Sequence, residues 1–152
     1  MKPFQFSLQA VATVRENEET RAREAYAHAV RLHRQVVVKQ QEIEGGIQEN
    51  LAECGQAFDQ GANAEKVVHI QAILRVLRAR LKEFSEDVAR LQRAVDEKWR
   101  QLVLARQRRE VVGKVHDRQL AAHEAEAVRT DQLSMDEMAA LRGAGALAYK
   151  GT

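Results

Sequence analysis

Residues 67–95 read VVHIQAILRVLRARLKEFSEDVARLQRAV and place an apolar residue at every alternating step of three and four. An average spacing of 3.5 residues keeps one stripe of an α-helix facing a partner helix along its whole length. The stretch therefore predicts the seam of a coiled coil. The seam positions are Val67, Ile70, Leu74, Leu77, Leu81, Phe84, Val88, Leu91 and Val95.

The partner helix is expected just upstream, where a weaker apolar period runs through residues 4–36 and uses small seam residues such as Ala22, Ala25 and Ala29. Past Ile43 we expect the register to slip, because the apolar residues then follow mainly at steps of four. Gly45-Gly46 lies at this slip, and each glycine weakens a helix by about 1 kcal/mol relative to alanine. The first helix is predicted to bend there. The residues expected to carry the slipped stripe are Ile47, Leu51, Cys54 and Phe58.

A turn is predicted at Asp59-Gln60-Gly61-Ala62-Asn63, where Gly61 suits a left-handed helix end and Asn63 suits the N-cap of a second helix. So short a turn forces the two helices to run antiparallel, and the numbers of contacting residues should add to about 122. The predicted fold is all-α, a single antiparallel coiled-coil hairpin over residues 1–152. Its parts are a first helix over about 4–59, a turn over 60–63, a longer second helix over about 64–141, and a flexible tail over 143–152.

The second helix is expected to outlast the first, because this register exhausts the first helix near residue 118. We call residues 117–141 the overhang. Between Asp117 and Glu137 six acidic residues face two basic ones, and an uncovered apolar and acidic helix end predicts a surface for a partner. A frayed, solvated tail is the alternative. The uncovered apolar residues of the overhang are Leu120, Val128, Leu133, Met135, Met138 and Leu141.

Composition supports long helices over a layered core, with 45% hydrophobic, 30% charged and only 5% aromatic residues. The formal net charge of +2 gives the whole chain no strong preference for nucleic acid or membranes. The single cysteine, Cys54, excludes an intramolecular disulfide and fits a reducing compartment. No signal peptide is visible, and no run approaches the roughly 18 apolar residues of a membrane span. We therefore expect a soluble, cytoplasmic protein.

Catalysis, metal binding and cofactor binding have no support in the sequence. His116 and His123 share a helix face but lie about 10.5 Å apart along the axis, too far to share one zinc ion, so we interpret them as solvated helix histidines. Cys54 lies on an apolar stripe and is interpreted as a packed thiol. Gly143-Ala144-Gly145 follows the predicted second helix, so it does not form a phosphate-binding loop. We therefore expect that the chain is not an enzyme.

Motifs at both ends of the chain resemble the FliJ proteins of the bacterial flagellar type III export apparatus. The amino-terminal motif is Phe4-Gln5-Phe6-Ser7-Leu8-Gln9, followed by Val14-Arg15-Glu16. The carboxy-terminal motifs, in order, are Trp99-Arg100, Asp117-Arg118-Gln119, Asp131-Gln132 and Met135-Asp136-Glu137-Met138-Ala139. The segment from Val36 to Val67 carries no motif of the family. The related injectisome stalk proteins are also similar, and the sequence does not separate the two uses.

The resemblance implies a non-enzymatic stalk similar to the gamma subunit of rotary ATP synthases. Such a stalk inserts into the ring of the export ATPase, reaches the cytoplasmic domain of the export gate, and escorts export chaperones. It would be peripheral to the membrane through the gate only. In the register of Trp99-Arg100, the family's gate-docking positions fall on Ile70, Leu74 and Leu77, which also belong to this chain's own seam, so internal packing is the alternative. The residues proposed for the ATPase and chaperone end are Arg118, Gln119, Asp136, Glu137 and Met138.

Two other function classes remain open. In a self-associating scaffold, the seam over residues 67–95 would pair with another copy of the chain and not with the first helix of its own chain. A nucleic-acid-binding helix would use residues 75–109, where eleven basic residues face five acidic ones. Two observations argue against nucleic-acid binding. Basic and acidic residues alternate along this stretch, and only Phe84 and Trp99 offer rings for stacking on bases.

Overall fold

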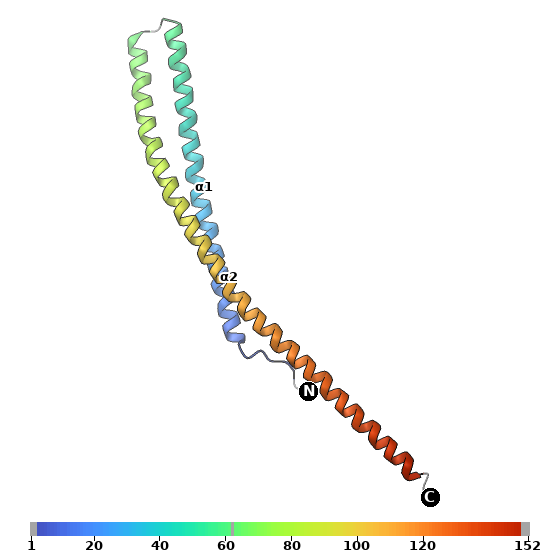
Figure 1. Cartoon of the computed structure of the whole chain (residues 1–152). Coiled ribbons are helices and arrows are strands. Elements are labelled where there is room, and N and C mark those ends of the chain that lie inside the picture. The colour runs from blue at the N-terminus through green and yellow to red at the C-terminus, as the bar shows by residue number, and fades with distance from the viewer. Residues whose placement is uncertain (1–2, 62, 150–152) are drawn as a thin grey trace. The chain divides into compact units, whose positions relative to one another are not determined.

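The computed structural model describes residues 3–61 and 63–149. Two helices account for nearly all of them, α1 (Gln9–Asp59) and α2 (Ala64–Tyr149), and the chain reverses direction between the two (Figure 1). The described residues contain no strand. The predicted all-α fold, with two long helices packed as a hairpin and the second longer than the first, is confirmed. Contacts divide the chain into two parts, described separately below: residues 18–105, and residues 1–17 with 106–152.

The helix ends differ from the predicted ones at two places. α1 begins at Gln9 and not at about residue 4, because Phe4 and Phe6 lie against α2 and do not continue the helix. α2 continues past Leu141 to Tyr149, through most of the predicted tail over 143–152. Each glycine there weakens the helix by about 1 kcal/mol, but the alanines between them are the best helix formers and no proline follows. Residues 150–152 lie outside the described part of the chain.

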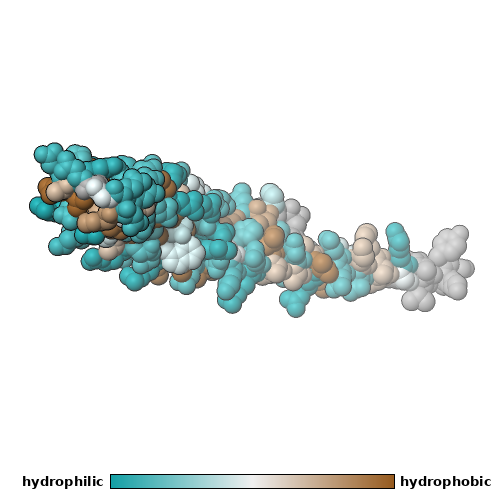
Figure 2. All heavy atoms as spheres, turned by 90° about the horizontal axis from the view of Figure 1, so that it is seen from above, coloured by the Kyte–Doolittle hydropathy of each residue, from teal (hydrophilic) through white to brown (hydrophobic). Residues whose placement is uncertain are grey.

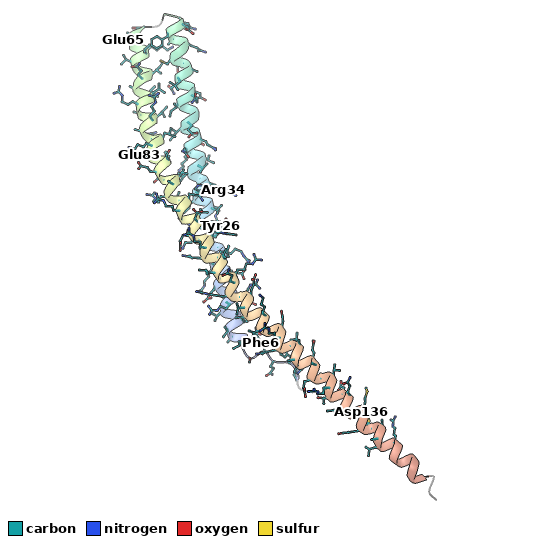
Figure 3. All side chains as sticks on the ribbon, viewed as in Figure 1. Phe6, Tyr26, Arg34, Glu65, Glu83 and Asp136 are labelled. Atoms are coloured by element: carbon teal, nitrogen blue, oxygen red, sulfur yellow. The ribbon has the colours of Figure 1, made fainter. Side chains whose placement is uncertain are left out.

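The turn that closes residues 18–105 has the predicted capping chemistry. Gly61 has φ +66°, the left-handed conformation that ends a helix at low cost only for glycine. The Asn63 side chain accepts a hydrogen bond from the backbone N–H of Glu65 at 3.2 Å, and its carbonyl accepts one from Lys66 at 3.1 Å. Asn63 is therefore the N-cap of α2, and Glu65 places a negative charge in the first turn, where the helix dipole favours it (Figure 3).

The core of residues 18–105 is the predicted seam. Ile70 and Leu74 are only 2% and 5% exposed and pack with Ile47 of α1. All nine seam residues from Val67 to Val95 are buried or half-buried. Full burial of one such side chain contributes about 1.5–3 kcal/mol, so this stripe is the main source of hairpin stability. Half-buried residues packed against the core are Ile43, Cys54, Leu77 and Leu81.

Contacts along residues 18–105 confirm the antiparallel register. The Lys66 ammonium lies 3.9 Å from the Glu53 carboxylate near the turn, and Gln40 Nε2 donates a hydrogen bond to Ser85 Oγ at 3.1 Å further along. The expected sum of about 122 places Trp99 opposite residues close to Ala22 and Ala25, and its ring lies at a tilt to that of Tyr26, with the ring centroids 5.4 Å apart. Each pair lies within a few residues of the expected register.

The predicted register slip in α1 is wrong. Phe58 is 65% exposed, whereas its neighbour Ala57 is 3% exposed. The stripe keeps its alternating steps because Asn50 takes a seam position that the sequence reading gave to Leu51. The Asn50 amide donates a hydrogen bond to the Gly46 carbonyl at 2.8 Å, which satisfies a polar group on the half-buried face. α1 runs unbroken through Gly45-Gly46. The observed stripe is Ile43, Ile47, Asn50, Cys54 and Ala57.

None of the helices in the described residues combines the length and the apolar character needed to cross a membrane.

Candidate partner-binding surfaces

Residues 3–8, which we call the arm, form a non-helical segment that lies against α2. The Phe4 ring contacts His116 and His123 edge-on, with centroids 5.5 Å and 5.6 Å apart. The Phe6 ring contacts His116 at 5.0 Å, in the region labelled in Figure 3. Both histidines are half-buried as a result. The interpretation of them as solvated histidines is therefore wrong. The sequence did not reveal these contacts, because the phenylalanine rings lie more than a hundred residues away along the chain.

A polar contact also holds the arm. Ser7 Oγ lies 3.2 Å from both Oε1 and Nε2 of Gln119, so the hydroxyl can donate to the amide oxygen or accept from the amide nitrogen. Gln119, one of the predicted partner-binding residues, is half-buried by this contact. The arm thus covers the first turns of the overhang, which the sequence reading left uncovered. Within the described residues, no cluster of three histidine, cysteine or acidic side chains could hold a metal ion.

The seam between the start of α1 and α2 is loosely packed and polar. Small side chains at Ala12 and Gly113 leave a cavity of about 280 Å³ beside the arm. Glu16 and Arg109 reach its wall, in contrast to the aliphatic core near the turn. A charged seam packs less tightly than an aliphatic one and serves mainly to fix register. The cavity is lined by Phe6, Gln9, Ala12, Glu16, Arg109, Val112, Gly113 and His116.

Beyond the arm, the overhang is bare. Its large apolar side chains from Val128 onward are 53% to 73% exposed. Figure 2 shows brown, apolar atoms lying open between teal ones along α2 toward its grey end. The expectation of an uncovered apolar surface is confirmed for this stretch, but it is wrong for Leu120, which is half-buried where the arm covers α2. These exposed residues are Val128, Leu133, Met135, Met138 and Leu141.

The polar residues predicted for partner binding do not form one cluster. Arg118 and Asp136 are eighteen residues apart, which is five helical turns, so they share a helix face at a separation of about 27 Å. Gln119 and Glu137 share another face in the same way. Arg118, Asp136, Glu137 and Met138 are exposed, and none of the first three makes a side-chain hydrogen bond or ion pair within the described residues. They can serve only an extended contact along the helix.

The residues predicted for gate docking lie mostly inside the hairpin. Ile70 and Leu74 are buried against Ile47, and Leu77 is half-buried beside them. The burial favours the internal-packing alternative for these two side chains. Leu77 also borders a shallow outer groove of about 280 Å³ on α2, beside the exposed Val76. The sequence analysis did not predict this groove. The signal that could have revealed it is that α2 carries apolar residues outside the seam, such as Val76. The other residues that line this groove are His69, Ala72 and Ile73.

A second groove near the turn, of about 420 Å³, joins apolar and basic side chains from the two helices. Cys54 and Leu51 of α1 lie across from Leu74 of α2, and Arg75 and Arg78 stand at its edge. Cys54 is half-buried and packs against the core. The residues that line this groove include no histidine or carboxylate that could accept the thiol proton.

The profile of the family described as "Flagellar FliJ protein" matches residues 4–147. The chain belongs to the FliJ family. Membership identifies it as a non-catalytic stalk component of the type III export apparatus and implies association with the export ATPase. The match spans the arm, both helices and the overhang.

Two further comparisons accompany the FliJ assignment. A solved structure, that of a putative YscO homolog, CT670, from Chlamydia trachomatis, is similar over 91% of this chain and 94% of that one. The identity is 18% and the TM-score 0.48. A search of functionally curated proteins returned no match.

Proposed function

We propose that this FliJ-family chain is the stalk of a flagellar type III export apparatus, with the overhang and arm as its contact for the export ATPase ring. The observation that carries the proposal is the bare end of α2, where apolar side chains stay exposed beyond the start of α1. A helix with no packing partner over several turns gains stability only when another molecule covers it. The FliJ family is non-catalytic, so we assign ATP hydrolysis to the partner.

For the ATPase and chaperone end we propose contacts through Arg118, Gln119, Asp136, Glu137 and Met138. Four of the five are exposed, and within the described residues Arg118, Asp136 and Glu137 make no ion pair, which supports the proposal. Gln119 is half-buried by the arm and borders the exposed surface. Their spread along α2 fits partners that grip the helix lengthwise. Export chaperones would use the same exposed surface.

For the export gate we propose a contact near the turn, on the outer side of α2. Leu77 and Val76 border an apolar groove there, while Ile70 and Leu74 hold the helix in place from beneath. Through this contact the protein would lie at the cytoplasmic face of the membrane without entering it.

The seam argues against the self-associating scaffold. That alternative required the stripe over 67–95 to pair between chains, but α1 of the same chain covers it. The nucleic-acid alternative gains no support either, since Phe84 is half-buried in the seam and Trp99 stacks on Tyr26.

A pull-down with the export ATPase of a flagellar type III apparatus tests the proposal. The full chain should capture the ATPase, and a chain ending at Arg118 should not, while its circular dichroism per residue stays nearly unchanged. The double variant Arg118→Glu/Asp136→Lys keeps the helix and should weaken capture. Undiminished capture by both variants would place the contact elsewhere on the molecule.

A further inference from the structure

Two carboxylates lie within an apolar stripe of the overhang, in which Leu120 and Ala127 are half-buried and the residues from Val128 onward are exposed. At 3.6 residues per turn, Leu120, Ala127, Val128, Met135 and Met138 fall on one side of α2. Glu124 lies between the first three of them, at steps of three and four. Asp131 lies in the same way between Ala127, Val128 and Met135. Both carboxylates therefore occupy the middle of the stripe.

Neither carboxylate has a basic residue three or four positions away, where a side chain on the same helix face would lie. The positions three and four residues away from Glu124 and Asp131 hold only leucine, alanine, valine, serine and methionine. Within the described residues, both side chains are exposed and make no ion pair or hydrogen bond. By contrast, Glu126, on the opposite side of the helix, lies 3.9 Å from the guanidinium of Arg129. The two carboxylates inside the stripe therefore have no counterion within the described residues.

Covering this stripe with a purely apolar helix would be unfavourable. Such a helix would take two charges out of water without pairing them, and burial of an unpaired charge costs more than the adjacent apolar contacts return. A helix that presents Lys or Arg opposite each carboxylate avoids this cost. Because Glu124 and Asp131 are seven residues apart, about 10.5 Å along the axis, the basic residues must also be one heptad apart.

We infer that the overhang binds an amphipathic helix of a partner whose apolar stripe carries two basic side chains one heptad apart, paired with Glu124 and Asp131. The inference rests on the proposed function, since it gives the chemistry of the partner at the same end of the stalk. A second copy of the overhang does not fit, because two such stripes packed antiparallel bring Glu124 of one copy opposite Asp131 of the other. The flexible thioether side chains at Met135 and Met138 suit a surface that accommodates different helices.

The arm limits how far the partner helix extends. Phe4 and Phe6 already cover α2 at His116 and His123. The partner helix therefore packs on the stripe from Glu124 toward the carboxy-terminal end of α2.

Two synthetic helical peptides of about 28 residues test the inference, with leucine and alanine at all other stripe positions. One carries Lys at two stripe positions one heptad apart, and the other carries Glu there. Fluorescence anisotropy against the full chain should show the Lys peptide binding at least roughly tenfold more tightly, the range expected for close charge pairs at an interface. Equal affinity for the two peptides would overturn the inference.

Variants of the full chain separate charge pairing from helix stability. Glu124→Gln/Asp131→Asn should remove the preference for the Lys peptide, and Glu124→Lys/Asp131→Lys should reverse it toward the Glu peptide. Glu126→Gln and Leu133→Ala, both on the opposite side of the helix, should leave the preference unchanged. Circular dichroism checks that every variant keeps its helicity, and an unreversed preference in the Lys variant contradicts the inference.

The ATPase pull-down keeps this result distinct from the proposed function. ATPase capture that persists in Glu124→Lys/Asp131→Lys overturns the inference and leaves the stalk function standing. Selective binding of the Lys peptide without ATPase capture by the unaltered chain supports the charge pairing and overturns the ATPase as its partner.

Discussion

At the scale of single residues, the same type of side chain has opposite roles on the two sides of α2. Ile70 is 2% exposed in the seam, whereas Val68, two residues earlier, is 64% exposed. Both are β-branched apolar residues, so composition alone does not separate them. Their spacing from the neighbouring seam residues separates them, because only steps of three or four residues return a helix to its buried face.

We expect Ile70→Ala to destabilise the hairpin by about 2–5 kcal/mol, the range for deleting a buried aliphatic side chain that leaves a cavity. Val68→Ala should change stability by less than about 0.5 kcal/mol, since the valine is already in water. Urea unfolding followed by circular dichroism measures both. Equal effects of the two substitutions would mean that the seam assignment is wrong.

A residue-scale prediction also applies to the arm. The double variant Phe4→Ala/Phe6→Ala should release the arm from α2, because edge-on aromatic pairs contribute about 0.5–1.5 kcal/mol each beyond their buried area. The ring-proton NMR signals of His116 and His123 should shift toward those of solvated histidines. Phe58→Ala, at an exposed ring near the turn, is the control and should leave these signals in place. Histidine signals that do not move in the double variant would contradict the arm contact.

At the scale of elements, the sequence predicted the features that follow from a repeat or from helix capping. It missed the features that depend on contacts formed only in the folded chain. The seam over 67–95, Gly61 and Asn63 follow from local rules, and the structure has them as expected. The arm was missed because Phe4 and Phe6 fit a helical period, and only the contacts with His116 and His123 draw them out of it. Asn50 was missed because a polar residue reads as exposed until its hydrogen bond to Gly46 is seen.

Two glycines give a prediction of opposite sign at this scale. Gly61→Ala should destabilise the turn by about 1–2 kcal/mol, because a Cβ is disfavoured at the φ of +66° that this residue adopts. Gly55→Ala should stabilise α1 by about 0.5–1 kcal/mol, since the residue is helical and, apart from its chain neighbours and the adjacent helix backbone, its Cβ would meet no atom within 4 Å. Thermal unfolding of the two variants should shift the midpoint in opposite directions. A shift in the same direction would indicate that Gly61 does not hold the left-handed conformation.

At the scale of the whole molecule, stability and recognition depend on different residues. The aliphatic seam within residues 18–105 closes the hairpin, and the arm and overhang belong to residues 1–17 and 106–152. The sequence placed an uncovered surface on the overhang correctly, because register alone shows where α1 ends. It did not place individual contacts there, because exposure alone does not say what kind of partner binds a helix. The kind of partner follows only when the charges and the helix face that carries them are considered together, as at Glu124 and Asp131.

The last prediction is that the seam closes within one chain. In a Cys54→Ser background, a short bis-maleimide linker should join the thiols of Gln40→Cys/Ser85→Cys, because the side chains at these positions meet across the two helices, with Gln40 Nε2 3.1 Å from Ser85 Oγ. The product should migrate as a monomer and should persist when the protein is diluted, as expected for an intramolecular bond. Gln40→Cys/Arg93→Cys, displaced by about two helical turns on α2, should not be joined by the linker. A Gln40/Ser85 variant that gives only covalent dimers would show that the helices pair between chains, and the bare overhang would then lose its argument as a partner surface of a single hairpin.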